Sequence, residues 1–160
     1  DFKRTVLVVD DEDVNRTMLG TIIEQKYNVI YAKDGMEALT QIRLNADSLS
    51  LVLLDILMPE LDGYEVLKEI QSDSKLKKIP VIVLTSEKSA EIKSLDLGAA
   101  DFLSKPYDLP EVILARVQHS IQLFENTKKV LLTNIHISTI MYINNGHLYM
   151  NWMHHSKEDA

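Results

Sequence analysis

Apolar and polar residues alternate in short blocks along the first 126 residues. Five segments are mostly apolar and short enough to be strands: Val6–Val9, Asn28–Ala32, Leu51–Leu54, Val81–Leu84 and Phe102–Leu103. Nearly continuous apolar strands are typical of a parallel sheet that helices cover on both faces. The pattern therefore predicts a buried parallel sheet.

Between these segments, apolar residues recur at the three- and four-residue spacing of amphipathic helices. The residues with this spacing are Val14, Met18, Ile22 and Ile23, then Met36, Leu39 and Ile42, then Val66, Leu67 and Ile70, then Ile92 and Leu95, and finally Val112, Ile113, Val117, Ile121 and Phe124. Gly98 is placed to end the fourth helix with a left-handed cap. Strands that alternate with helices predict an α/β fold, a doubly wound five-stranded parallel sheet with five helices.

The composition changes near Lys129. Residues 130–160 contain only three charged side chains, but four of the five histidines and the single tryptophan. We therefore expect one domain over residues 1–126 and an extension of unknown role over residues 127–160. Asn145-Gly146 between apolar-rich runs favours a hairpin, while a linker remnant and a continued helix remain alternatives.

The overall composition narrows the classes of function. A formal net charge of −7 argues against direct nucleic-acid binding, because contacts to phosphates need a basic surface. The chain has no cysteine, which excludes disulfides and thiolate metal sites. No apolar run approaches the roughly 20 residues of a membrane span, and the N-terminus lacks a signal-peptide pattern. We expect a cytoplasmic protein that does not enter the membrane.

Polar residues that could carry chemistry follow four of the predicted strands. Asp10 and Asp11 follow the first strand, Asp55 the third, Thr85 the fourth and Lys105 the fifth. The carboxyl ends of parallel strands meet at one edge of the sheet, where ligands bind in open α/β folds. We therefore expect three carboxylates, one hydroxyl and one ammonium to face a common cleft.

Clustered carboxylates repel one another, and a bound cation would offset that repulsion. Mg²⁺ or Mn²⁺ accepts oxygen ligands, and Asp10, Asp11, Asp55 and the backbone carbonyl of Leu57 are the expected donors. Asp55 is then the candidate nucleophile for a phosphoryl group, with Thr85 and Lys105 able to contact the phosphoryl oxygens. Taken singly, each residue has a simpler interpretation as a turn, cap or solvated surface residue.

The motifs VLVVDDE, LVLLDILMPELDGYEVL, IPVIVLTS and GAADFLSKP resemble the receiver domain of bacterial two-component response regulators, from about Thr5 to Asn126. The resemblance implies a flavodoxin-like sheet in the order 2-1-3-4-5. It implies that Asp10 and Asp11 hold Mg²⁺, that Asp55 is the phospho-acceptor, and that Lys105 is the site lysine, preceding a cis Pro106. It also implies that Thr85 and Phe102 are the switch residues.

By the same resemblance, the phosphoryl donor is the phosphohistidine of a sensor histidine kinase or of a phosphotransfer protein. Phosphorylation then changes the surface formed by the fourth helix, fifth strand and fifth helix, where partners or a second copy dock. Two positions depart from the common family pattern: Ser86 stands where Ala or Gly is frequent, and Leu57 cannot position water through its side chain.

Two other functions fit parts of the pattern. A phosphatase of the haloacid-dehalogenase type also uses an Asp nucleophile, Mg²⁺, Thr and Lys, and Asp11-Glu12-Asp13 superficially fits its Asp-x-Asp motif. A degenerate receiver would act as a constitutive binding module without accepting phosphate. The leading interpretation is a phosphorylation-activated signalling switch, not a turnover enzyme.

Overall fold

The computed structural model describes residues 3–158, and the side chains of residues 3–136. Strands and helices alternate along the chain as the apolar pattern predicts. The elements are β1 (Thr5–Val9), α1 (Asp13–Ile23), β2 (Asn28–Ala32), α2 (Gly35–Leu44), β3 (Leu49–Asp55), α3 (Gly63–Ser72), the 3-10 turn η1 (Leu76–Lys78), β4 (Val81–Thr85), α4 (Lys88–Asp96), β5 (Asp101–Ser104) and α5 (Pro110–Glu158).

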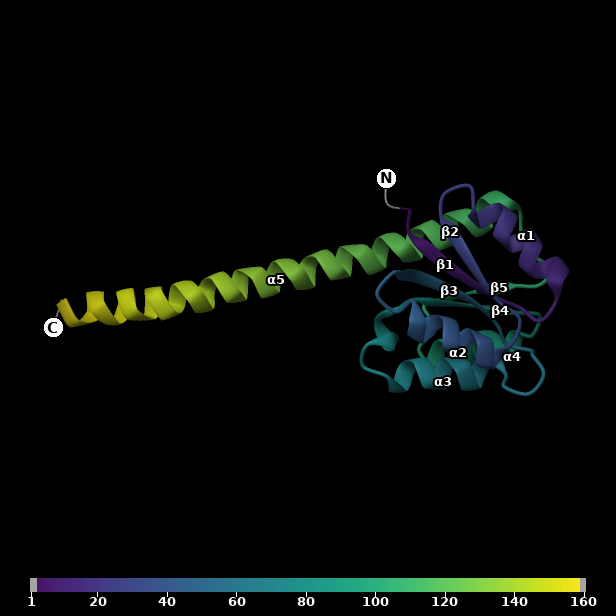
Figure 1. Ribbon diagram of the computed structural model, residues 1–160, viewed down its shortest axis with the longest axis horizontal. Coiled ribbons are helices and arrows are strands. Elements are labelled where there is room, and N and C mark those ends of the chain that lie inside the picture. Colours follow the sequence, from purple (N-terminus) through teal and green to yellow (C-terminus); the bar gives the residue numbers. More distant parts are fainter. Residues whose placement is uncertain (1–2, 159–160) are drawn as a thin grey trace. The chain divides into compact units, whose positions relative to one another are not determined.

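The five strands form one parallel sheet in the order β2-β1-β3-β4-β5, which confirms the predicted topology. α1 and the start of α5 cover one face, whereas α2, α3 and α4 cover the other (Figure 1). The register aligns the carboxyl ends of the central strands, because Val9 pairs with Leu54 and Thr85 pairs with Ser104. This alignment brings the residues that follow β1, β3, β4 and β5 to one edge.

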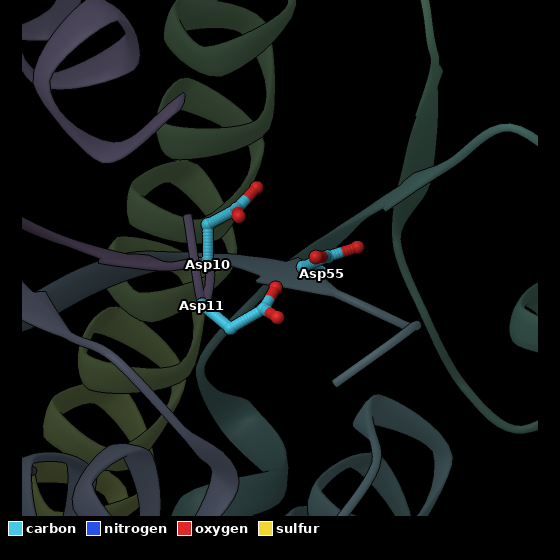
Figure 2. A group of neighbouring side chains, drawn as sticks. All are labelled: Asp10, Asp11 and Asp55. Atoms are coloured by element: carbon cyan, nitrogen blue, oxygen red, sulfur yellow. The ribbon is translucent and has the colours of Figure 1, made fainter. Parts of the chain in front are cut away.

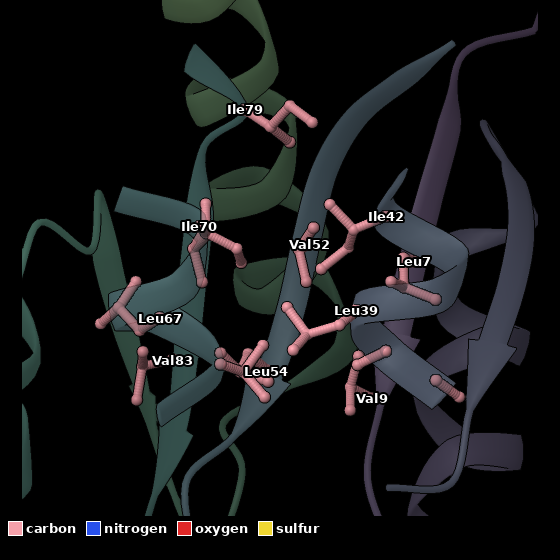
Figure 3. Close-up of a cluster of buried hydrophobic side chains, with 14 of the residues drawn as sticks. Leu7, Val9, Leu39, Ile42, Val52, Leu54, Leu67, Ile70, Ile79 and Val83 are labelled. Carbon is pink, nitrogen blue, oxygen red and sulfur yellow. The ribbon is translucent and has the colours of Figure 1, made fainter. Parts of the chain in front are cut away.

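The core consists of two apolar layers on opposite faces of the sheet. In β1, Leu7 and Val9 belong to the layer under α2 and α3, while Val6 and Val8 belong to the layer under α1 and α5. Figure 3 shows the first layer, with Leu39 of α2 among the side chains that meet the strands. Successive strand residues point to opposite faces, so burial on both faces explains why the strands are continuously apolar.

Local signals fix the helix ends near the site. Asp62 and Glu65 form a capping box at the start of α3, each side chain accepting a hydrogen bond from the other residue's backbone N–H. Gly98 follows α4 with a φ of 99°, which confirms the expected left-handed cap. The capping box fixes where the loop after β3 ends, and the Gly98 cap fixes where the loop before β5 begins.

Some of the apolar residues that predicted helices do not face the core. Val14 and Met36 are exposed, and on α4 both Ile92 and Leu95 are exposed, at 67% and 43%. The helices themselves are correctly predicted, but the face that α4 buries is not. A nine-residue helix has too few residues for the apolar spacing to identify its buried face.

The chain divides into two compact units, residues 1–124 and 125–160. α5 begins at Pro110 in the first unit and ends at Glu158 in the second. Asn145-Gly146 therefore lies within a helix and not in the hairpin that its sequence favours, because the i→i−4 backbone bonds of the helix continue through it. In the described part of the chain, no helix is both long and apolar enough to cross a membrane.

Gly63 lies where the start of α3 approaches the end of β3. Its N–H donates to the carbonyl of Ile56 at 2.9 Å. A Cβ at this position would meet the backbone carbonyl oxygen of Asp55 and would lie 2.7 Å from the Cα of Ile56. Both are backbone atoms, so a side chain at position 63 would displace the end of the strand that carries Asp55.

We predict that Gly63→Ala lowers the free energy of unfolding by about 2 kcal/mol, because neither the strand nor the helix can move cheaply. Urea unfolding followed by circular dichroism measures this. Gly20→Ala is the control, since its Cβ would meet the hydroxyl end of Tyr31, a partly exposed side chain that can rotate away. Equal losses in the two variants would contradict the prediction.

Candidate functional site

Three carboxylates gather at the carboxyl edge of the sheet, as the strand-end pattern predicts. Asp10 and Asp11 follow β1, and Asp55 ends β3 beside them (Figure 2). One ligand oxygen of each lies within 4.8 Å of those of the other two. Asp10 and Asp55 are buried, at 0% and 3% exposure, whereas Asp11 is exposed. The edge thus holds two acidic groups with little access to solvent.

Lys105 joins the two buried carboxylates. Its Nζ lies 3.2 Å from Oδ2 of Asp10 and 3.3 Å from Oδ1 of Asp55. Burial lowers the pKa of Lys105, but the two carboxylates together outweigh burial and raise it. The lysine therefore stays an ammonium and bridges the ends of β1 and β3 from the end of β5.

Burial also controls the protonation of Asp55. Burial raises the pKa of this carboxyl most, Asp10 adds to the rise by repulsion, Lys105 opposes both, and the resulting pKa is about 6. Above pH 6 Asp55 is a carboxylate held in a poorly solvated position. Ionised Asp55 is the form able to act as a nucleophile.

Thr85 ends β4, and Phe102 lies within the neighbouring strand β5, where it pairs with Val83. Thr85 is 2% exposed, and its Oγ1 accepts a hydrogen bond from the N–H of Glu87 at 3.0 Å. Phe102 is partly buried and packs against the core layer under α2 and α3. The side chain of Leu57 is exposed, at 57%. Because a leucine side chain has no oxygen, the backbone carbonyl is the only ligand that this residue can offer.

The donor set fits a hard divalent cation. Three carboxylates and one ammonium carry formal charges of −3 and +1, which leaves −2 for a cation to neutralise. Opposite oxygens around Mg²⁺ stand about 4.2 Å apart, at twice a bond length of about 2.1 Å. The 4.8 Å spread of Asp10, Asp11 and Asp55 is therefore close to what one shared ion requires.

Two residues that sequence reasoning missed also define the site. Arg16 donates from Nη1 to the backbone carbonyl of Asp10 at 2.6 Å and pairs with Asp13, which fixes the turn between β1 and α1. The i,i+3 spacing of Asp13 and Arg16 was the available signal. Tyr107 follows the cis Lys105–Pro106 bond, and its hydroxyl is buried with no hydrogen-bond partner within the described residues. No sequence signal indicated that burial.

This fold and this acidic edge define a class: an α/β domain with clustered carboxylates and a lysine at the switch point of its parallel sheet. The family description "Response regulator receiver domain" matches residues 6–118. The chain belongs to this family. Its members are signalling domains of two-component systems, and acceptance of a phosphoryl group on an aspartate is typical of them.

Similar proteins agree with this assignment. The chain is 40% identical over 127 residues to "Probable transcriptional regulator ycf27" of Cyanophora paradoxa, an alignment covering 78% of this chain and 51% of that protein. A solved response regulator of Chloroflexus aurantiacus J-10-fl superposes with a TM-score of 0.70 at 33% identity, covering 75% of this chain and 98% of that one. The chemotaxis protein CheY4 of Vibrio cholerae superposes with a TM-score of 0.67 at 32% identity. That alignment covers 74% of this chain and 98% of the CheY4 chain.

Several curated relatives are much longer than the matched region. The chain spans 10–51% of the length of the first five, among them a histidine kinase, a cyclic di-GMP phosphodiesterase and transcriptional regulators. The shared part is the receiver domain, so the different activities in those names do not carry over to this chain.

We predict that Asp55→Asn is more stable than wild type at pH 7.5 by on the order of 2 kcal/mol, measured by urea unfolding in EDTA. The native state keeps the Asp55 proton up to about pH 6, whereas the ordinary pKa is 3.8. Ionising Asp55 therefore costs native stability as pH rises from about 4 to 6, and the advantage of Asn should vanish near pH 4.

The control is Asp47→Asn, which removes an exposed carboxylate paired with Lys75. It should change stability by no more than about 0.5 kcal/mol at either pH. A stability difference between Asp55→Asn and wild type that is the same at pH 4 and pH 7.5 would contradict the raised pKa.

Proposed function

We propose that residues 1–126 form a phosphorylation switch in which Asp55 accepts a phosphoryl group. The donor is the phosphohistidine of a sensor histidine kinase or of a phosphotransfer protein. The observation that carries this proposal is the contact of Lys105 with the buried carboxylates of Asp10 and Asp55, beside the exposed Asp11. It supports a site that holds one nucleophile and neutralises incoming phosphate charge.

The transfer follows from this arrangement. An oxygen of ionised Asp55 attacks phosphorus, the O–P bond forms, and the N–P bond of the donor breaks with its electron pair returning to the imidazole. Lys105 is close enough to pair with a phosphoryl oxygen, since its Nζ already lies 3.3 Å from Asp55 Oδ1. Thr85 is the hydroxyl donor for another phosphoryl oxygen, at the end of the adjacent strand.

Asp10, Asp11, Asp55 and the Leu57 carbonyl are the proposed ligands of Mg²⁺, with Mn²⁺ as a substitute. When bound, the cation supplies positive charge to the phosphoryl oxygens and orients them toward the acceptor. The protein's own contribution is to hold Asp10 and Asp55 together in a poorly solvated position, which Lys105 makes tolerable. In this proposal the domain promotes only its own phosphorylation and dephosphorylation and turns over no other substrate.

The surface of α4, β5 and α5 is the proposed output. Ile92 and Leu95 of α4 and Val112 of α5 are exposed apolar residues. The same elements carry opposite charges: Oδ1 of Asp101 on β5 lies 3.6 Å from Nη1 of Arg116 on α5. Exposed apolar residues together with charges of both signs suit a two-fold contact with a second copy, because each copy presents both halves of every pair. Residues 127–160 are then an extension beyond the switch.

We predict one added phosphoryl group, seen as intact mass, after incubation with acetyl phosphate and Mg²⁺. The adduct should be lost in Asp55→Asn and in EDTA, because the acceptor and the cation are then missing. Folding of each protein is checked by circular dichroism. No adduct on folded wild type would make this a degenerate receiver, and turnover of a phosphomonoester would favour the phosphatase.

We also predict that BeF₃⁻, a mimic of the phosphoryl group, increases the self-association of the chain, measured by sedimentation velocity. In the presence of BeF₃⁻, Leu95→Glu should lower the dimerisation constant at least tenfold, which corresponds to about 1.4 kcal/mol. A charge in the centre of an apolar contact is costly to bury. The control is Leu44→Glu, an exposed leucine on α2 at 76%. Equal dimerisation of both variants would place the contact elsewhere.

A further inference from the structure

α4 is attached to the sheet in an unusual way. The residues it buries are Ala90, Glu91 and Ser94, while Ile92 and Leu95 remain exposed. Burial of apolar side chains normally supplies most of the stabilisation of a surface helix. Because α4 buries only one small apolar side chain, its polar contacts contribute a larger share of its attachment.

The central polar contact joins α4 to β5. Ser104 Oγ donates to Oε1 of Glu91 at 2.7 Å, and Glu91 is only 8% exposed. The second carboxylate oxygen, Oε2, lies 3.6 Å from Nζ of Lys88, an exposed side chain on the same helix. Hydrogen bonds to a charged group are stronger than neutral ones, and loss of the donor would leave a buried carboxylate without its hydroxyl partner.

Ser104 occupies a sensitive position in the sheet. It pairs with Thr85 in the ladder between β4 and β5, and it directly precedes Lys105. The N–H of Lys105 donates to the carbonyl of Thr85 at 2.7 Å. The contact from Glu91 therefore ends at the strand residue that lies beside two of the proposed phosphoryl-binding groups.

A second contact joins the start of α4 to the end of β4. Thr85 Oγ1 accepts from the N–H of Glu87, which is the N-cap position of α4. A movement of Thr85 Oγ1 toward a phosphoryl group on Asp55 would therefore either stretch this hydrogen bond or carry the start of α4 with it. The position of α4 and the orientation of Thr85 are therefore coupled by two short connections, one at each side of the helix start.

We propose that the Glu91–Ser104 hydrogen bond is a latch that holds α4 against β5 and opposes the reorientation of Thr85 toward a phosphoryl group on Asp55. Glu91 and Ser104 are then positioning residues that set how much of the phosphoryl binding energy goes into moving α4. This inference rests on the proposed function, since it concerns the regulation of the same site.

The test is the affinity of the full chain for BeF₃⁻ in saturating Mg²⁺, measured by titration with NMR detection. Ser104→Ala should bind BeF₃⁻ about tenfold more tightly than wild type, because the closed arrangement loses a charge-assisted hydrogen bond. Glu91→Gln keeps an acceptor oxygen but loses the charge, so its gain should be smaller, about threefold. Ser104→Thr retains the hydroxyl and should restore the wild-type affinity.

Ser94→Ala is the matched control. Ser94 is fully buried on α4, and its hydroxyl donates to the carbonyl of Ala90 at 2.6 Å, within the helix itself. Its loss should leave BeF₃⁻ affinity within twofold of wild type. Hydrogen exchange adds a second readout: amides of α4 should exchange faster in Ser104→Ala than in Ser94→Ala before BeF₃⁻ is added.

The outcomes separate the two proposals. Wild type that binds BeF₃⁻, together with Ser104→Ala of unchanged or weaker affinity, would overturn the latch and leave the proposed function standing. Wild type that neither binds BeF₃⁻ nor is modified by acetyl phosphate would overturn the proposed function, and the latch with it. If Ser94→Ala binds BeF₃⁻ as tightly as Ser104→Ala does, both substitutions have loosened α4 in a general way. That result would also overturn the latch.

Discussion

The contact of one ammonium with two buried carboxylates is the constraint on which this domain depends. Asp10 and Asp55 have almost no exposure, and isolated charges in such positions are costly. Lys105 lies within 3.3 Å of both, so β5 must deliver it to the ends of β1 and β3. The sheet order and the register satisfy that requirement, and residual negative charge remains to attract a cation. The contacts of Lys105 with Asp10 and Asp55 thus contribute both to the stability of this edge and to its chemistry.

Neighbouring elements hold the residues of this acidic edge in position through hydrogen bonds. Arg16 fixes the backbone of Asp10, and Asp10 Oδ1 accepts from the N–H of Glu12 at 2.9 Å. On the other side, α4 touches the site through Glu87 and Glu91. A helix held by polar contacts can change position at a lower free-energy cost than one held by a large apolar face. The polar attachment of α4 therefore suits the response to a charge at Asp55 that we propose for this helix.

Much of the fold and of the site could be predicted from the amino-acid sequence. The five strands, their parallel arrangement and the gathering of Asp10, Asp11 and Asp55 follow from apolar runs and from the rule that strand ends share an edge. The motifs around them predicted the family, to which the chain belongs. Predictions failed where few residues carried the signal. The short α4 exposes the leucine and isoleucine that predicted it, and Asn145-Gly146 lies in a helix instead of a turn.

The sequence by itself determined the elements and which polar residues gather at the ends of the strands, because apolar periodicity and strand-end polarity are local properties that folding preserves. Only the tertiary structure decided which carboxylates Lys105 contacts, how burial raises the pKa of Asp55, and that Glu91 meets Ser104. Those features join residues 13 to 95 positions apart. Their distances depend on how whole strands and helices pack, and packing is a property of the complete sheet that no single segment encodes.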